Sequence, residues 1–285
     1  MIKLEKRKKR RIRKRIIKRR KFGLIISVIV IVILSCLIFY INSNGKVKSV
    51  LPANAENSLK KSVVTPKKVT LKPKLKSPTA DFYKHIYKSD GHKIAYLSFD
   101  DGPSANNTPL ILKTLDKYNI KATFFIVGNM AIKYPDLVKK ELADGHSIGN
   151  HSYSHNYNYL YSNTNTFISD INKCDTILKS ILGSNFSTKL VRFPGGSFGG
   201  KLKPFRESLN SAGYNYVDWN DLTGDAEGQN IPVSKLLSNL KKNTEGKDHV
   251  VILMHDFFTK STTAQALPQV IEYLKSQKYS FKTLN

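Results

Sequence analysis

The sequence predicts an α/β domain, built on a parallel sheet or a β/α barrel, that follows one transmembrane helix and a disordered linker. Three observations lead to this prediction. Residues 23–41 form an uncharged apolar run, residues 42–80 are rich in lysine and proline, and from residue 81 onward short β-prone runs alternate with amphipathic helical patterns. We therefore divide the chain of 285 residues into a basic tail (1–21), a transmembrane helix (22–41), a linker (42–80) and a folded domain (81–285).

The charge of the chain is concentrated ahead of the folded domain. The formal net charge is +26, but residues 1–21 hold 14 basic residues against one acidic residue, and residues 42–80 hold nine lysines against one. Residues 81–285 have 24 basic and 19 acidic residues, a net charge of +5. No nucleic-acid partner is therefore expected for the domain, and contact of the tail with acidic lipid is favoured over contact with RNA. The lysine- and proline-rich linker is expected to be a self-repelling tether.

The apolar run is long enough to span a bilayer. Its 19 residues, 23–41, would form a helix about 28 Å long, which matches the hydrocarbon thickness of a membrane. Four basic residues at 18–21 precede it, so the positive-inside rule places the tail in the cytoplasm and the domain outside. We expect a single-pass protein of the cell membrane, with the lipid bilayer as the partner of residues 23–41.

A cleaved signal peptide and a lipoprotein are the alternatives to a permanent anchor. Ala53-Asn54-Ala55 has the form of a cleavage site, but it lies twelve residues beyond Ile41. Attachment of lipid at Cys36 fits less well, because apolar residues continue past that cysteine. Both alternatives leave the domain outside the cytoplasm. The second cysteine, Cys174, falls in a predicted helix, so no disulfide is expected.

The first half of the domain predicts three strands and three helices. Residues 94–99 and 122–127 are short apolar β-prone runs, and residues 147–150 lead directly into His151. Helical spacing predicts helices over 108–118, 131–143 and 167–182. The last of these is the clearest, because its apolar residues recur at spacings of three and four: Phe167, Ile168, Ile171, Cys174, Ile177, Leu178 and Ile181.

The second half continues the alternation, and several strands end directly in polar or turn residues. The same criteria predict strands at 190–193, 214–219 and 250–254 and helices at 233–240 and 263–275. The residues that follow strands are Asp100-Asp101-Gly102, His151, Pro194-Gly195-Gly196 and His255-Asp256. Because the carboxyl ends of parallel strands meet on one face, we expect these residues to gather where the chemistry of such a fold takes place.

Two weak motifs become informative together. His151 and His155 have the i, i+4 spacing that puts two imidazoles on one face of a helical turn, and the pair could bind one metal ion. Asp100-Asp101 could by itself be a helix cap or a turn. Two histidines and one aspartate, however, leave coordination positions open for water and substrate, as in catalytic sites, and the second carboxylate could accept a proton. His255 could supply the opposing acid.

Four motifs in order resemble the polysaccharide deacetylase (NodB-type) homology domain of carbohydrate esterase family 4. They cover about residues 90–285 and read Ser98-Phe99-Asp100-Asp101-Gly102, His151-Ser-Tyr-Ser-His155, Arg192-Phe-Pro-Gly-Gly196 and Leu253-Met-His255. The resemblance implies a distorted (β/α) barrel, a divalent metal (zinc, with cobalt tolerated), and hydrolysis of N- or O-acetyl groups on polysaccharides.

The resemblance also implies a role for each motif residue. It makes Asp100 the general base, which Arg192 orients. It makes His255 the general acid, which Asp225 holds, and the backbone N–H of Gly195 an oxyanion donor. The metal ligands that it implies are Asp101, His151 and His155. Two positions depart from the family pattern. Gly195 stands where tyrosine is frequent, which loses one wall of the substrate groove, and Ala226 stands where tryptophan is frequent, a loss for which Trp219 is a candidate replacement.

Other polar residues are expected to be structural. His146 is expected in a turn rather than as a third metal ligand, Asp256 to hydrogen-bond locally, and Asp218 and Asp221 to be solvated loop carboxylates or caps. The tyrosines at 153, 157, 159 and 161 could stack on sugar rings or pack inside the domain.

These features predict an extracytoplasmic hydrolase whose partner is cell-wall polysaccharide. The preferred substrate is N-acetylglucosamine of peptidoglycan, and the enzymatic alternatives are N-acetylmuramic acid, poly-N-acetylglucosamine, chitin oligomers and acetylxylan. The alternative from another class is a non-catalytic protein that binds wall glycans on the same fold. A full set of base, metal ligands and acid argues against it, because a binder needs neither acid nor base.

Overall fold

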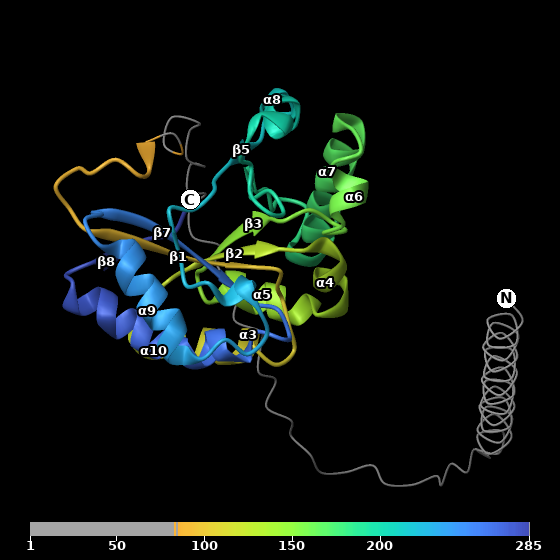
Figure 1. The fold of residues 1–285 in the computed structure, drawn as a ribbon. Coiled ribbons are helices and arrows are strands. Elements are labelled where there is room, and N and C mark those ends of the chain that lie inside the picture. Colours follow the sequence, from red (N-terminus) through yellow and green to blue (C-terminus); the bar gives the residue numbers. More distant parts are fainter. Residues whose placement is uncertain (1–82, 84, 285) are drawn as a thin grey trace, which may run out of the picture. The chain divides into compact units, whose positions relative to one another are not determined.

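One parallel sheet forms the centre of the domain in the computed structural model, which describes residue 83 and residues 85–284. Its strands are β1 (Ile94–Asp100), β2 (Thr123–Ile126), β3 (Ser147–Asn150), β4 (Leu190–Val191), β5 (Asn215–Tyr216), β6 (Asp221–Leu222), β7 (His249–His255) and β8 (Ser280–Phe281). Their order is β5-β4-β3-β2-β1-β7-β6, and β8 pairs with the start of β1 (Figure 1).

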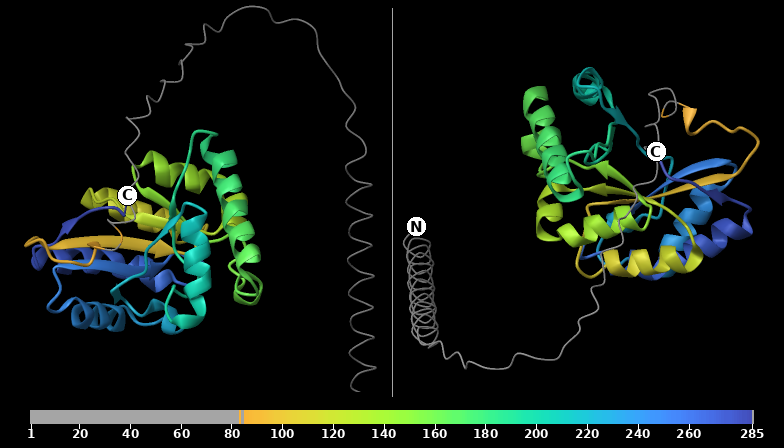
Figure 2. Two further views of the ribbon diagram at one scale, coloured as in Figure 1. Left: turned by 90° about the horizontal axis from the view of Figure 1, so that it is seen from above. Right: turned by 180° about the vertical axis from the view of Figure 1, so that it is seen from behind.

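Helices cover the outer face of this sheet. They are α3 (Thr108–Tyr118), α4 (Gly128–Lys133), α5 (Pro135–Ala143), α6 (Tyr157–Leu160), α7 (Thr164–Leu182), α8 (Lys203–Ser211), α9 (Val233–Thr244) and α10 (Ser261–Ser276), with short 3₁₀ turns η1 (Gly200–Leu202) and η2 (Asp225–Glu227). Helices α3 and α9 both pack against α10, whereas α7 packs against α4, α5 and α8. The two groups meet where α3 contacts α5, and Figure 2 gives the arrangement from above and from behind.

Strand β1 has both faces buried, and its alternating side chains enter two different cores. Ala95, Leu97 and Phe99 pack with the helices in one apolar cluster, whereas Ile94 and Tyr96 belong to a second cluster on the inner face. Successive side chains of a strand point to opposite faces. The same alternation therefore puts the polar residues near the end of β1 on the inner face of the sheet.

The sheet is a curled half-barrel and not a closed barrel. Strands β5 and β6 follow each other in the sequence but lie at opposite ends of the sheet, and within the described part of the chain no ladder joins them. Each is two residues long, so neither offers the hydrogen bonds that closure would require. The predicted parallel α/β sheet is confirmed, and the implied barrel takes this open form. Tyr83, Ile86 and Leu284, from outside the strands, fill the inner cluster.

Pro135 divides one predicted helix into two. The single helix expected over 131–143 is two helices, because Tyr134 lies between them with φ −133° and ψ 56° and Pro135 begins α5. Proline has no N–H to donate, and its ring disfavours the helical conformation in the preceding residue. The prediction also missed α6, α8, β6 and β8. Helix α8 has only two apolar residues, Phe205 and Leu209, and of these Leu209 alone is buried.

The predicted membrane segment cannot be compared with the structure. The tail (1–21), the apolar run (23–41) and the linker (42–80) lie outside the described residues. Among the described residues, no helix has the length and apolar character needed to cross a membrane. Cys174 is buried with a free thiol.

Asp221 was expected to be solvated, and this expectation is wrong. It lies in β6 with 1% of its surface exposed, and neither carboxylate oxygen accepts a hydrogen bond from the described residues. Burial raises the pKa of Asp221 to about 7, although Lys247 acts to lower it. No local pattern predicts this burial, because it depends on the pairing of β6 with β7.

This buried carboxyl predicts a pH-dependent stability. Between about pH 4 and pH 7, Asp221 is ionised in the unfolded state but stays protonated in the folded state. The free energy of unfolding of the wild type therefore falls as the pH rises through this range. We expect the free energy of unfolding of Asp221→Asn, relative to the wild type, to increase by about 2–4 kcal/mol between about pH 4.5 and pH 8. Urea unfolding at the two pH values measures it, and an unchanged difference would show that Asp221 is ionised in the fold.

Candidate active site

The carboxyl end of β1 supplies two adjacent carboxylates to one site. Neighbouring side chains of a strand point to opposite faces, so Asp100 and Asp101 could not both face the site if the strand continued. Strand β1 ends at Asp100, and Asp101 has a left-handed backbone with φ 72°. Such a conformation costs a non-glycine residue about 1–3 kcal/mol and is typical of functional sites. The turn brings the second carboxylate back toward the first.

His151 and His155 come together, but not on a helix. The segment between β3 and α6 contains no helical turn, and Ser152 and His155 have positive φ angles of 69° and 51°. The two imidazole centroids are nevertheless 5.0 Å apart. The predicted pairing is thus confirmed, and the helical geometry from which it was inferred is wrong, because a tight irregular loop achieves the same approach.

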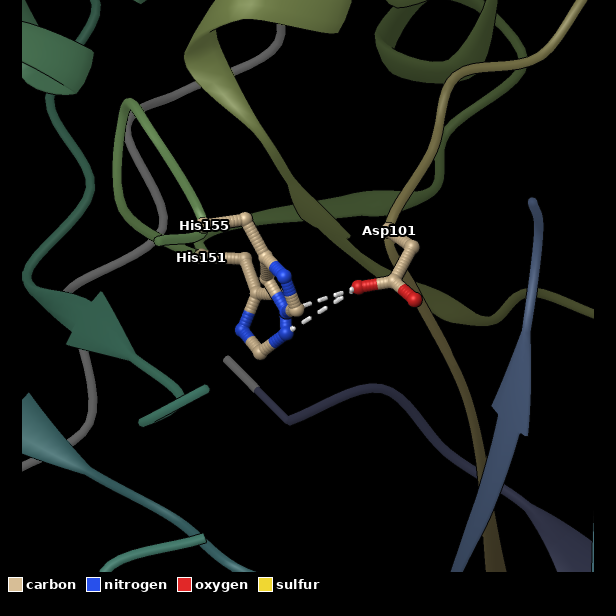
Figure 3. Close-up of side chains that lie close together, drawn as sticks. All are labelled: Asp101, His151 and His155. Atoms are coloured by element: carbon tan, nitrogen blue, oxygen red, sulfur yellow. Dashed lines mark ion pairs between the residues drawn. The ribbon is translucent and has the colours of Figure 1, made fainter. Parts of the chain in front are cut away.

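Asp101, His151 and His155 converge as a set of metal-ligating side chains (Figure 3). Both Nε2 atoms face Oδ1 of Asp101, at 3.5 Å from His151 and 3.1 Å from His155. The three candidate ligand atoms lie within 4.8 Å of one another. Burial by itself would raise the pKa of Asp101, but the two imidazoles outweigh it and lower the pKa well below its usual range.

This set fits a divalent cation. Oδ1 of Asp101 is buried and faces the two imidazole nitrogens without a well-formed hydrogen bond among the described residues, and a cation between these atoms would satisfy it. One carboxylate and two imidazoles form a three-ligand set that leaves coordination positions free, as in catalytic zinc sites. The side chain of His151 is 3% exposed, whereas those of His155 and Asp101 are 26% and 21% exposed, so the site can be reached from solvent.

The ring of His151 is oriented by the backbone behind it. Its Nδ1 lies 2.8 Å from the carbonyl oxygen of Arg192. A carbonyl only accepts, so Nδ1 carries the proton and donates, which leaves the lone pair of Nε2 directed at the metal position. A backbone carbonyl behind a metal-binding imidazole fixes both the tautomer and the ring plane.

Arg192 holds Asp100 from inside the half-barrel. Its guanidinium is fully buried, and Nη1 donates to Oδ1 of Asp100 at 2.9 Å and to Oγ of Ser98 at 2.7 Å. The other guanidinium nitrogens donate to the carbonyls of Val217 and Asp218. Ser98 opens the first sequence motif but received no role from the sequence, although it lies two residues before Asp100 on the same strand and therefore on the same face.

Loss of Arg192 is expected to destabilise the fold strongly. Arg192→Met would leave Asp100 buried without a partner, which typically costs about 3–5 kcal/mol. Arg206→Met is a matched control, since Arg206 is half-buried and donates to the backbone carbonyls of Ser197 and Gly199 only. Urea unfolding should show a loss of at most about 1.5 kcal/mol for the control. Equal losses for both variants would contradict the burial argument.

His255 is held by Asp225 on the strand beside Asp100. Strand β7 pairs with β1 so that His255 lies opposite Asp100. Asp225 accepts from Nδ1 of His255 at 2.8 Å and from its backbone N–H at 2.8 Å. Burial acts to lower the pKa of His255, but the Asp225 carboxylate outweighs it and raises the pKa to about 9. The Asp225 carboxylate thus favours the protonated imidazole, which is the form that can act as an acid.

Two further side chains hold Asp225, and sequence reasoning missed them. Thr263 donates to its Oδ2 at 2.7 Å, and Lys260 donates to its backbone carbonyl at 2.7 Å. Both lie at the beginning of α10, so no spacing in the sequence relates them to Asp225. Ala226, the second departure from the family pattern, follows Asp225 in η2.

The turn at Gly195 is held by a carboxylate that was expected to be solvated. Asp218 accepts from the backbone N–H and the hydroxyl of Ser197, at 2.9 and 2.6 Å, and so it braces the loop that follows Gly195. Gly195 is exposed with φ +78°, and its N–H donates to no group in the described chain. This free N–H is available to a ligand.

The expectation for His146 is confirmed, and that for Asp256 needs correction. His146 is buried, accepts from the backbone N–H of Ala122 at 3.2 Å and packs its ring against Phe124. Asp256 accepts hydrogen bonds from Ser104 and Thr108, which are distant in the sequence and not local. These contacts tie the end of β7 to the loop after Asp101.

Known proteins with similar sequences and folds were compared with this chain. The family described as polysaccharide deacetylase matches residues 87–217. A peptidoglycan-N-acetylglucosamine deacetylase of Bacillus cereus is 34% identical over 193 residues, which are 67% of this chain and 68% of that protein. The peptidoglycan-N-acetylglucosamine deacetylase PgdA of Listeria monocytogenes is 33% identical over 207 residues, which are 70% of this chain but 40% of that protein. The structure of a CE4 esterase of Streptococcus mutans is similar with a TM-score of 0.67 and 34% identity, covering 73% of this chain and 92% of that one.

Proposed function

We propose that this chain, which belongs to the polysaccharide deacetylase family, is a metal-dependent hydrolase that removes N-acetyl groups from cell-wall polysaccharide. Its substrate in this proposal is N-acetylglucosamine of peptidoglycan. One observation carries the proposal. A carboxylate on an arginine, a three-ligand metal set and a histidine held by an aspartate meet at the same end of the sheet.

The metal set defines the reacting centre. A divalent cation held by Asp101, His151 and His155, for which we propose Zn²⁺ with Co²⁺ as a substitute, supplies Lewis acidity toward the acetyl carbonyl. Asp100 and His255 lie at the paired ends of neighbouring strands beside this set, where one could accept and the other donate a proton. The exposed N–H of Gly195 is suited to donate to the oxygen that becomes negative in the transition state.

The protons move through Asp100 and His255. Asp100, with Oδ1 held by Arg192, presents Oδ2 near the metal set and accepts a proton from the attacking water. His255 enters the reaction protonated, because Asp225 stabilises the imidazolium. It donates a proton to the departing amine, and Asp225 keeps Nε2 of the ring as the donating atom. A protein that only binds glycans would need neither group.

The choice of peptidoglycan rests on the relatives. Both curated relatives described above carry peptidoglycan N-acetylglucosamine deacetylase as their names. The test uses the full chain, purified in detergent with Zn²⁺ or Co²⁺, on peptidoglycan, poly-N-acetylglucosamine, chitin oligomers and acetylxylan. Acetate release is measured, mass spectrometry identifies the product sugar, and Asp100→Asn is the blank. Release of acetate from another polymer alone would change the substrate, and no release from any polymer would overturn the enzymatic function.

We also propose that residues 23–41 anchor the chain in the cell membrane with residues 81–285 outside. The support is the uncharged apolar run preceded by basic residues. Full-length protein should remain in the membrane pellet after alkaline carbonate extraction, and protease added to intact protoplasts should remove the domain. Release of the domain by carbonate, or its protection from protease, would contradict the anchor or its orientation.

A further inference from the structure

Tyr157, the first residue of α6, lies between the metal set and the Gly195 turn. Its ring meets the ring of His155 edge to face, with centroids 5.4 Å apart. His155 in turn lies 3.1 Å from Asp101. The tyrosine is 49% exposed, so part of its ring faces solvent beside the metal ligands.

The same ring covers the backbone of Gly195. A Cβ atom built on Gly195 would lie 2.8 Å from Cε1 of Tyr157 and 3.4 Å from its Oη. The first distance is too short for a real contact, so the tyrosine occupies the space that any side chain at position 195 would enter. The positive φ of Gly195 independently favours glycine there. The aromatic group that the sequence lacks at position 195 is therefore supplied by Tyr157.

Helix α6 is fixed in this place by a second tyrosine. Tyr161 donates its hydroxyl to the carbonyl of Pro194 at 2.7 Å, immediately before Gly195. Its ring also packs against Phe167 and Phe205. The helix and the turn are thus joined, so Tyr157 is a positioned side chain and not a freely rotating surface residue.

We propose that Tyr157 is a specificity-determining residue whose ring forms the wall against which the acetylated sugar packs at the reacting centre. The inference rests on the proposed function, since it assigns the substrate contact of that same site. Aromatic rings offer a rigid apolar face with a polar tip, which suits the mixed apolar and hydroxylated surface of a sugar. In this proposal the ring of Tyr157 takes the place of the groove wall whose loss is expected from Gly195.

Tyr159 provides a matched control on the same helix. It is 50% exposed, which is nearly the same as Tyr157, and it makes no ring contact with the described aromatic residues. Its backbone N–H caps α6 by donating to Asn156, a contact that substitution of the side chain leaves in place. Any general effect of removing an exposed tyrosine from α6 should therefore be seen in Tyr159→Ala as well.

The first experiment measures deacetylation of peptidoglycan by the full chain loaded with Zn²⁺. Tyr157→Ala should lower kcat/KM about 10- to 100-fold, whereas Tyr157→Phe should stay within about threefold and Tyr159→Ala within about twofold of the wild type. Zinc content is measured for each variant. Equal effects of the two alanine variants would overturn the proposal. So would loss of zinc from Tyr157→Ala, because Tyr157 would then be a support for His155.

The second experiment reads the sugar contact without turnover. The zinc-loaded Asp100→Asn protein is sedimented with insoluble peptidoglycan to measure its affinity. The affinity is then compared with that of two double variants, which carry Tyr157→Ala or Tyr159→Ala in addition to Asp100→Asn. We expect affinity to fall at least about fivefold with the former and to be unchanged with the latter. If the wild type released no acetate, a Tyr157-dependent affinity would uphold this inference while the catalytic function failed. An affinity that Tyr157→Ala leaves unchanged would overturn the proposal.

Discussion

Asp100→Asn is expected to lower kcat on acetylated glycan about 10²- to 10⁴-fold while the zinc content of the protein stays the same. Asparagine retains the shape of Asp100 and can still meet Nη1 of Arg192 through its carbonyl oxygen, so the fold should tolerate it. It cannot accept a proton from water. The proposed metal ligands are Asp101, His151 and His155 and do not include Asp100, so metal affinity should persist.

The measurement is kcat from acetate release together with zinc by atomic absorption on the same preparation. Ser98→Ala is a useful control, because its hydroxyl also accepts from Arg192 but lies further from the reacting centre. It should reduce kcat far less than Asp100→Asn. If Asp100→Asn kept more than a tenth of the wild-type kcat, the general base would have to be another group.

Asp101→Asn should abolish both metal binding and activity. It is the same change of side chain as Asp100→Asn, made at the next residue, but its expected effect on metal binding is the opposite. Asp101 supplies the one anionic ligand of the set, and its Oδ1 lies within 3.5 Å of both imidazole nitrogens. Loss of even an outer contact to a metal ligand typically weakens metal affinity about 10- to 100-fold, so loss of the ligand itself should weaken it by at least about 100-fold.

Thermal unfolding with and without zinc measures this loss independently of turnover. A metal that binds only the folded state raises its stability by RT ln(1 + [L]/Kd), which is about 2.7 kcal/mol at a hundredfold excess over Kd. The wild type and Asp100→Asn should be stabilised by added zinc, and Asp101→Asn should not. Chelation of the wild type should reproduce the inactivity of Asp101→Asn and be reversed by Zn²⁺ or Co²⁺. Equal zinc stabilisation of the two asparagine variants would remove the distinction between the carboxylates.

Much of the fold could be predicted because its signals are local. The helix over 108–118 was predicted with the bounds of α3, and the apolar spacing of 167–182 marked all but the first turn of α7. Prediction was least accurate where an element is short. Strands β4, β5 and β6 are two residues long, and pairing with neighbours defines them more than their own sequence does.

The histidine pair shows how a correct pairing can rest on the wrong geometry. The i, i+4 spacing of His151 and His155 is compatible with a helical turn and equally with the irregular loop that the chain forms. The motif identified the residues because chemistry requires their side chains to meet. It did not identify the backbone, because several backbone paths bring two residues at this spacing together.

The sequence by itself determined the candidate residues of the site and the strand ends that carry them, that is, a candidate base, three candidate metal ligands and a candidate acid, since residue type and spacing are properties of the chain. Only the tertiary structure decided what surrounds them. Burial of Asp221, the bracing of the loop by Asp218, and the Tyr157 ring over Gly195 all depend on contacts between segments far apart in the sequence. Such contacts are set by how strands pair and helices pack, and no local pattern encodes them.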